Sequence, residues 1–169
     1  EKGAQVIGLD NFITGTHQNI EILSRFPNFQ FFECNVFEEL PSQLDQYKVD
    51  FLFSMASPAS PIDFAKIPME ILRVNSEGTR QLLEVAKKHK ARFLEASTSE
   101  VYGDPLEHPQ KESYFGNVNP IGPRSCYDEG KRCAETLFFD YRRQHQLPIK
   151  VARIFNTYGP NMHPQDGRV

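Results

Sequence analysis

Two residues in the second half of the chain have the types and the spacing for acid–base chemistry. Tyr127 and Lys131 are four residues apart, in a run that begins at Ser125. On a helix this spacing places both side chains on one face. A neighbouring ammonium group favours the ionised form of a phenol and lowers its pKa toward neutrality, so Tyr127 could act as a general base near pH 7. The spacing alone is common on helix surfaces, so this interpretation depends on the rest of the chain.

A group of hydroxyls and a carboxylate precedes this pair. Ser97, Thr98, Ser99 and Glu100 follow one another directly, and such groups can hydrogen-bond a substrate and fix its position. The connection from Gly103 to residue 126 is rich in proline and glycine and is too long for a plain loop. Long ordered loops are usually functional. We therefore interpret residues 97–131 as one candidate catalytic unit.

Short apolar runs alternate with longer stretches of helical periodicity. The pattern predicts strands at residues 5–10, 29–33, 50–55, 92–96 and 149–153, and helices at residues 37–44, 68–90 and 128–145. Strands that alternate with helices are joined by right-handed crossovers and form a parallel sheet covered on both faces. We therefore predict an α/β fold, a Rossmann-like doubly wound parallel sheet with helices on both faces, in a single partial domain over residues 1–169.

Polar side chains gather where the predicted strands end, and in such sheets ligands bind beside the carboxyl ends of the strands. Asp10 follows the first strand, where an acid can bind the ribose hydroxyls of a dinucleotide; a helix N-cap or a turn aspartate is the alternative. Asn35 could equally be a turn residue. The full set is Asp10-Asn11, Asn35, Ala56-Ser57, Ser97 to Glu100 and Phe155-Asn156-Thr157.

Two polar residues lie inside the long predicted helix over residues 68–90. Arg73 could simply belong to a solvated face. Asn75 is an unfavourable residue in the middle of a helix, which favours a contact made by its side chain. Arg124 and Arg153 are either structural cations or lie at the edge of a substrate site, and the sequence does not separate these roles.

Composition excludes several classes of protein. A net charge of −3 argues against a general nucleic-acid binder, and no apolar run approaches the roughly 18–20 residues that cross a bilayer. The start of the chain shows no secretory signal. The 3 cysteines lack paired metal-ligand spacing and the 5 histidines are scattered, so we predict reduced thiols, no metal and a cytoplasmic location.

These motifs together resemble the extended short-chain dehydrogenase/reductase family, which comprises nucleotide-sugar epimerases, dehydratases and decarboxylases. Within it the chain is most similar to the decarboxylases that act on UDP-glucuronate. The resemblance covers essentially the whole chain, and the residues that carry it are 10–15, 56–61, 96–105, 108–110, 119–124, 126–132 and 153–160.

The resemblance implies NAD as the cofactor, UDP-glucuronate as the substrate and a homodimer formed through the two long helices. The residues that it implies for catalysis are Thr98, Ser99, Glu100, Tyr127 and Lys131. Those implied for cofactor binding are Asp10, Asn11, Phe12, Thr14, Gly15, Asn35, Val36, Ala56, Ser57, Asn75, Tyr127, Lys131, Thr157 and His163. Those implied for substrate binding are Pro58, Arg73, Ser99, Glu100, Tyr127, Asn156 and Arg168.

One position favours decarboxylation over dehydration. The 4,6-dehydratases of the family have an aspartate at the position of Ser99, and this acid expels a hydroxyl group from C6. A serine offers no carboxyl group for that step, whereas loss of CO₂ from a 4-keto sugar acid requires none. In the implied mechanism Tyr127 takes the proton of the 4-hydroxyl, Thr98 holds the 4-oxygen, Lys131 also binds the nicotinamide ribose, and Glu100 with Ser99 positions the carboxylate or returns a proton to C5.

The chain departs from the family pattern at Asn35-Val36, at Ser54-Met55-Ala56, where the family usually has His-Leu-Ala, and at both ends. Asn35-Val36 stands where the family usually has Asp-Val. The glycine-rich turn that binds the pyrophosphate is expected to precede Glu1, and the smaller substrate domain to follow Val169. We therefore expect the isolated chain, truncated at both ends, to bind NAD poorly and to turn over little substrate. The alternatives are a 4-epimerase or 4,6-dehydratase of the same family, and a non-catalytic fragment that binds a partner.

Overall fold

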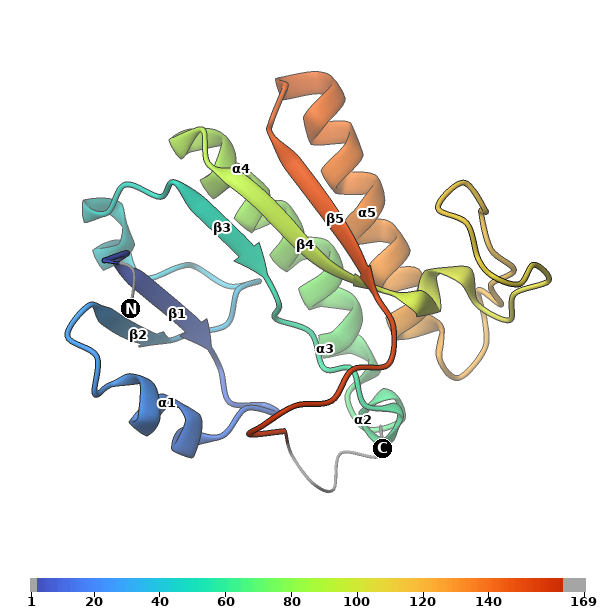
Figure 1. The fold of residues 1–169 in the computed structure, drawn as a ribbon, viewed down its shortest axis with the longest axis horizontal. Coiled ribbons are helices and arrows are strands. Elements are labelled where there is room, and N and C mark those ends of the chain that lie inside the picture. Colours follow the sequence, from blue (N-terminus) through green and yellow to red (C-terminus); the bar gives the residue numbers. More distant parts are fainter. Residues whose placement is uncertain (1–2, 163–169) are drawn as a thin grey trace.

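The computed structural model describes residues 3–162 and contains two parallel sheets (Figure 1). Strands β1 (Val6–Asp10) and β2 (Phe29–Glu33) form one sheet. The other has the order β3-β4-β5, with β3 at Phe51–Ser54, β4 at Arg92–Thr98 and β5 at Ile149–Ile154. The predicted strands are therefore present, all paired in parallel. They form two sheets instead of one, because within residues 3–162 no ladder joins β1 to β3.

The two predicted long helices are also present. Helix α3 (Pro68–Arg73), the π-helical turn η2 (Val74–Gly78) and α4 (Thr79–His89) follow one another without a break and cover the predicted helix at 68–90. Helix α5 (Ser125–His145) starts three residues before the predicted position.

The shorter helices were predicted less well. In place of the helix expected at residues 37–44, the structure has a 3₁₀ turn η1 at Ser42–Gln46. Helix α1 (His17–Leu23) was not predicted, since it buries no residue and thus has no apolar stripe to reveal it. The short α2 (Pro61–Phe64), also not predicted, begins with a proline in its first turn and is capped by the Ser60 side chain.

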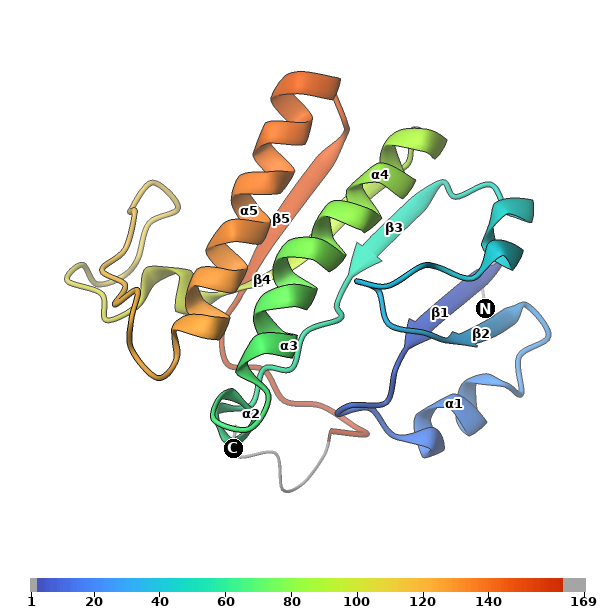
Figure 2. The ribbon, with the colours of Figure 1, turned by 180° about the vertical axis from the view of Figure 1, so that it is seen from behind.

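The main core lies between the three-stranded sheet and helices α4 and α5, which pack on one of its faces (Figure 2). Phe93 of β4 contacts Phe138 of α5, with ring centroids 4.5 Å apart. Leu52 of β3 packs against this core, whereas its neighbours Phe51 and Phe53 point the other way and are each 58% exposed. In the described part of the chain, helices therefore cover one face of this sheet at β3 rather than both.

The long connection after β4 is ordered. It follows the 3₁₀ turn η3 (Ser99–Tyr102) and contains an isolated bridge between Gly103 and Asn117. The Arg132 guanidinium of α5 donates to two carbonyls, of Val101 and Phe115, both at 2.8 Å. These bonds fasten the connection to the first half of α5, which supports its interpretation as a functional loop. None of the helices described here is long and apolar enough to cross a membrane.

Candidate functional site

The proposed base and its lysine lie buried at the start of α5. Tyr127 is 6% exposed and Lys131 4%. The Lys131 ammonium donates to the carbonyl of Ala96 at 2.9 Å and to the carboxylate of Glu95 at 3.1 Å, both in β4. The Tyr127 ring is stacked on Phe64 of α2, with centroids 5.0 Å apart. The two Lys131 contacts hold the start of α5 against β4.

The hydroxyl and carboxylate side chains of Thr98, Ser99 and Glu100 follow at the carboxyl end of β4. Thr98 is the last residue of β4, and its hydroxyl accepts a hydrogen bond of 3.2 Å from the backbone N–H of Glu100, which caps η3. The Glu100 carboxylate is paired with the Arg124 guanidinium, immediately before α5. Since η3 and α5 are in contact, the structure brings the five predicted catalytic residues to one end of the sheet: Thr98, Ser99, Glu100, Tyr127 and Lys131.

An acid that sequence reasoning missed lies next to the proposed base. Asp128 is 8% exposed, and its Oδ1 has no hydrogen-bond partner within residues 3–162. Burial raises its pKa to about 6, with Arg124 opposing the shift and Glu100 adding to it. Asp128 lines an open cavity together with Glu100, Arg124 and Asn119. Only its place beside Tyr127 could have marked this residue in the sequence.

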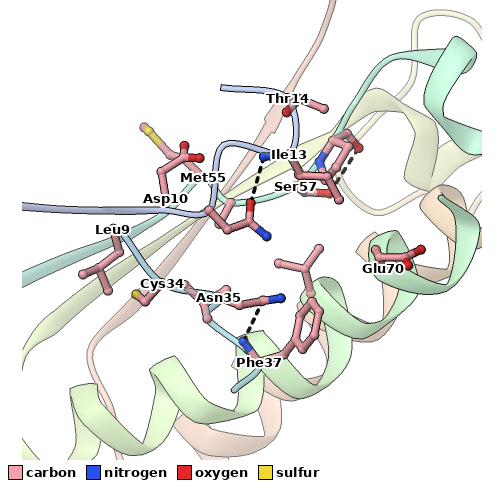
Figure 3. A pocket seen from close by; sticks show the side chains of 15 residues that line it. Leu9, Asp10, Ile13, Thr14, Cys34, Asn35, Phe37, Met55, Ser57 and Glu70 are labelled. Carbon is pink, nitrogen blue, oxygen red and sulfur yellow. Dashed lines mark hydrogen bonds between the residues drawn. The ribbon is translucent and has the colours of Figure 1, made fainter. Parts of the chain in front are cut away.

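A second pocket lies at the carboxyl ends of β1, β2 and β3 (Figure 3). Eight of the predicted binding residues line it: Asp10, Asn11, Thr14, Asn35, Val36, Ala56, Ser57 and Pro58. Its other lining residues were not predicted: Leu9, Ile13, Cys34, Phe37, Met55, Glu70 and Val74. Most of these are apolar, and in a sequence such residues cannot be told from ordinary core positions.

At the rim of this pocket, Asp and Asn side chains each accept a hydrogen bond from the backbone N–H two residues further on. Asp10 accepts a hydrogen bond from the backbone N–H of Phe12 at 2.7 Å, and Asn11 accepts one from Ile13 at 3.1 Å. Asn35 does the same for Phe37 at 3.4 Å. The turn alternative given for Asp10 and Asn35 is thus confirmed, and the three turns fix their side chains at the pocket (Figure 3).

Two of the predicted cofactor residues shape the turn after β1 without lining the pocket. A Cβ atom at Gly15 would lie 2.9 Å from a carboxylate oxygen of Asp10, so glycine allows this close approach. The Phe12 ring packs on His17, with centroids 3.9 Å apart, and on Phe31.

Asn75 makes the contact that its place in a helix suggested. It lies in the π-helical turn η2, is 2% exposed, and its amide donates to the Ser57 hydroxyl at 2.9 Å and to the Ile71 carbonyl at 2.8 Å. Turns of this kind are frequent at functional sites. Asn75 joins the long helix to the loop after β3, and a Cβ atom at Gly130 of α5 would lie 3.2 Å from its Cβ.

Other predicted residues lie apart from both cavities. Arg73 forms a 3.1 Å ion pair with Glu77 and lies over the Phe37 ring, 4.1 Å from its centroid. Asn156 and Thr157 are exposed after β5, and the Thr157 hydroxyl donates to the Phe155 carbonyl.

Two predicted binding residues, His163 and Arg168, lie outside the described residues. Arg153 has a structural role: its guanidinium bonds the Glu135 carboxylate at 2.8 and 3.0 Å. Within residues 3–162, no three or more His, Cys, Asp or Glu side chains gather closely enough to hold a metal ion.

Parallel strands with a pocket at their carboxyl edge define a Rossmann-like nucleotide-binding domain, and the buried Tyr127 and Lys131 lie at the same edge. The comparison with family models agrees with this class. The chain belongs to the NAD dependent epimerase/dehydratase family, whose model matches residues 1–169.

Three curated relatives of the chain are UDP-glucuronic acid decarboxylases. The chain is 51% identical over 168 residues to UDP-glucuronic acid decarboxylase 1 of Arabidopsis thaliana, covering 99% of this chain and 38% of that protein. It is 53% identical over 165 residues to UDP-glucuronic acid decarboxylase 5 of the same plant, covering 98% and 47%. The decarboxylase of Xenopus tropicalis is 50% identical, covering 99% and 38%. The chain therefore spans less than half the length of these relatives.

Solved structures show the same fold. UDP-glucuronic acid 4-epimerase from Bacillus cereus, in complex with NAD, has a TM-score of 0.77 at 29% identity, with 97% of this chain and 52% of that chain covered. UDP-glucose 4-epimerase from Thermotoga maritima, with UDP-glucose, has a TM-score of 0.83 at 25% identity, with 96% and 51% covered.

Proposed function

We propose that this chain carries the catalytic centre of an NAD-dependent enzyme that converts UDP-glucuronate into UDP-xylose and CO₂. One observation carries the proposal: Tyr127, Lys131 and Thr98 lie together at the end of β4, in a chain that is 51% identical to a UDP-glucuronic acid decarboxylase over 99% of its length. The chain thus has the acid–base residues that this activity requires, and its similarity to a decarboxylase supports the same activity.

The residues at the pocket fit the adenosine part of NAD. The pocket combines apolar walls from Leu9, Ile13 and Val74 with polar groups at strand ends, which suits a flat base attached to a ribose. Asp10 would accept hydrogen bonds from the ribose hydroxyls, and Asn35 would meet the adenine. When bound, NAD supplies the hydride acceptor and donor at C4 of the sugar.

The residues of the catalytic end perform the proton chemistry. Tyr127 takes the proton of the sugar 4-hydroxyl and later returns it to the 4-oxygen. The positive charge of Lys131 favours the ionised phenol, and the Thr98 hydroxyl holds the 4-oxygen in place. With C4 as a ketone, the carboxylate at C6 is that of a β-keto acid, which loses CO₂ and leaves an enolate. Hydrogen bonds to the enolate oxygen stabilise it.

Ser99 and Glu100 would act on the other side of the sugar. Ser99 has no carboxyl group with which to expel a hydroxyl from C6, which disfavours dehydration. Glu100, held in place by Arg124, would position the substrate carboxylate or return the proton to C5. The second candidate is a 4-epimerase, since UDP-glucuronic acid 4-epimerase of Bacillus cereus shares the fold. Release of CO₂ separates the two activities.

We also propose that the protein is a homodimer that pairs through α3–α4 and α5. Met69 and Leu72 on α3 and Phe139 on α5 are large apolar residues that stay 62%, 37% and 39% exposed, which supports burial against a second copy. A single monomeric mass in light scattering of the longest polypeptide that the gene encodes would refute it.

The three free thiols, Cys34, Cys126 and Cys133, support the cytoplasmic location that we propose.

The experiment on the base compares two phenol-to-phenyl substitutions on the same helix. In the longest polypeptide that the gene encodes, with NAD present, Tyr127→Phe should lower the turnover of UDP-glucuronate by about 10²–10⁴-fold. Tyr141→Phe removes a phenol that bonds Glu84 near the other end of α5 and should leave turnover within a few-fold of the parent. Equal turnover in the two variants would show that Tyr127 is not the base.

A further inference from the structure

A carboxylate lies in an unusual place, in the middle of β4. Glu95 is 0% exposed and lies between Phe93 and Ser97 on the face of the strand that meets α5. Central strands of parallel sheets are usually apolar on both faces, and a buried charge is costly unless it is paired. The presence of Glu95 at this position therefore requires a partner that compensates for its burial.

That partner is the lysine of the catalytic pair. The Lys131 ammonium lies 3.1 Å from Oε1 of Glu95 and donates to the carbonyl of Ala96 at 2.9 Å. The two side chains are 4% and 0% exposed, so water screens the pair little. Two of the three donors of the ammonium group are used by these contacts. Oε2 of Glu95 has no hydrogen-bond partner in the part of the chain that the structure describes.

We propose that Glu95 is a positioning residue that holds Lys131 at the carboxyl end of β4 and offsets part of its charge, thereby setting how readily Tyr127 ionises. This inference rests on the proposed role of Tyr127 as the base. Glu95 contacts the Lys131 ammonium and acts on Tyr127 through it.

The charges around Lys131 single out Glu95. Besides Tyr127 and Lys131, the titratable or charged side chains on and against this half of α5 are Cys126, Asp128, Glu129, Arg132, Cys133 and Glu135 of the helix, Arg124 just before it, Glu95 of β4, Glu100 of η3 and Arg153 of β5. The residues buried here from α2, α3 and η2 are the uncharged Phe64, Ile71 and Asn75. Arg153 is paired with Glu135, and Glu100 with Arg124. Among these charges, only Glu95 is in direct contact with the Lys131 ammonium.

The sign of the effect follows from this arrangement. Lys131 stabilises an ionised Tyr127 through its positive charge, and Glu95 cancels part of that charge at 3.1 Å. In Glu95→Gln, the side-chain oxygen can still accept a hydrogen bond from Lys131, so the ammonium stays in place. Its positive charge is then less compensated. Tyr127 should then ionise at lower pH.

The test is a titration of Tyr127 in the absence of NAD and substrate. In the longest polypeptide that the gene encodes, tyrosinate absorbance near 295 nm is followed against pH for each variant. The signal of the same variant carrying Tyr127→Phe as well is subtracted, so that changes at Tyr141, which bonds Glu84, cancel. Glu95→Gln should shift the Tyr127 transition to lower pH by about 0.5–1 unit. Glu84→Gln removes one negative charge on α4, beyond direct contact with Lys131, and should not shift it. A transition unchanged by Glu95→Gln would overturn the proposal.

Activity supplies a second and separable readout. If the protein decarboxylates UDP-glucuronate, the rising limb of its kcat–pH profile should move to lower pH in Glu95→Gln by the same amount, and an unmoved limb would contradict the proposal. If no turnover is found, the proposed function fails while the absorbance titration still tests Glu95. Should Glu95→Gln not fold, Glu95→Asp retracts the charge, and it should give a smaller shift in the same direction. No shift in that variant would overturn the proposal as well.

Discussion

Asp128, beside the proposed base Tyr127, shows how burial controls the ionisation of an acid to which the sequence assigned no role. It is 8% exposed, and its pKa is about 6, because burial disfavours the carboxylate more than Arg124 favours it, and Glu100 adds repulsion. Its ionised form is therefore less favourable in the folded chain than in the unfolded one. The consequence is a dependence of stability on pH that can be measured without any substrate.

Asp128→Asn should stabilise the protein at neutral pH. The folded pKa of about 6 lies above the ordinary value of 3.8, so the stabilising contribution of the wild-type acid is present below about pH 4 and is lost as pH rises through about 6. The variant has no such loss. Its free energy of unfolding should exceed that of the parent by about 1–2 kcal/mol at about pH 7.5 and match it near pH 4.

Urea unfolding at these two pH values measures the difference. Asp140→Asn changes an exposed aspartate on the same helix, one that pairs with Arg143, and should show little dependence on pH. A stability gain of Asp128→Asn that is the same at both pH values would contradict the assigned pKa.

Single residues also show what the sequence could not reveal. Thr98, Glu100, Tyr127 and Lys131 were selected from type and spacing, and the structure places them at one end of the sheet. Glu95 was interpreted only as a strand residue, since its partner Lys131 lies 36 positions away along the chain. Contacts of this range depend on the fold, and residue type gives no indication of them.

Among the elements, the connection between β4 and α5 depends most visibly on one glycine. Gly103 has φ of +65° directly after η3, and a Cβ atom there would lie 2.2 Å from the backbone oxygen of Asn117. The backbone would have to move apart at the bridge between these two residues. This position therefore excludes every residue with a side chain.

Gly103→Ala should lower the free energy of unfolding by about 2–4 kcal/mol, because strain and a backbone clash add together. Thermal and urea unfolding measure the loss. Gly159→Ala provides the matched control, since nothing lies within 4 Å of the Cβ position of Gly159. A loss below about 0.5 kcal/mol in Gly103→Ala would show that the connection is not packed as described.

Periodicity explains which elements were found from sequence. The helix at 68–90 was predicted from its apolar spacing, whereas the π-helical turn at Val74–Gly78 was not, because one widened turn changes the register too little to be seen. Helix α1 buries no residue and so leaves no periodic signal. The strand ends at Asp10, Glu33 and Ser54 lie within one residue of the predicted positions.

For the molecule as a whole, the two sheets meet through shared packing rather than through a common ladder. Leu9 of β1 packs on the core formed by β4, α4 and α5, and Val36 after β2 is part of that core. The pocket between the strand ends draws its residues from both sheets. Pairing between distant strands depends on tertiary contacts, which explains why the sequence predicted one sheet where the described residues form two.

The chain spans 38% and 47% of the lengths of two UDP-glucuronic acid decarboxylases, so the proposed reaction is tested on the longest polypeptide that the gene encodes. The fold and the tyrosine–lysine pair are equally compatible with epimerisation at C4. Only the fate of the C6 carboxylate separates the two chemistries. Ser99 favours its loss, and the comparison with the decarboxylases supports the same outcome.

The most direct test is release of label from UDP-glucuronate that carries ¹⁴C at C6. The longest polypeptide that the gene encodes is incubated with this substrate and NAD, and the trapped CO₂ and the remaining sugar nucleotide are both counted. We predict that label appears as CO₂ in a one-to-one ratio with an unlabelled UDP-pentose. Retention of all label in a UDP-hexuronate with inverted C4 would contradict decarboxylation and establish the epimerase.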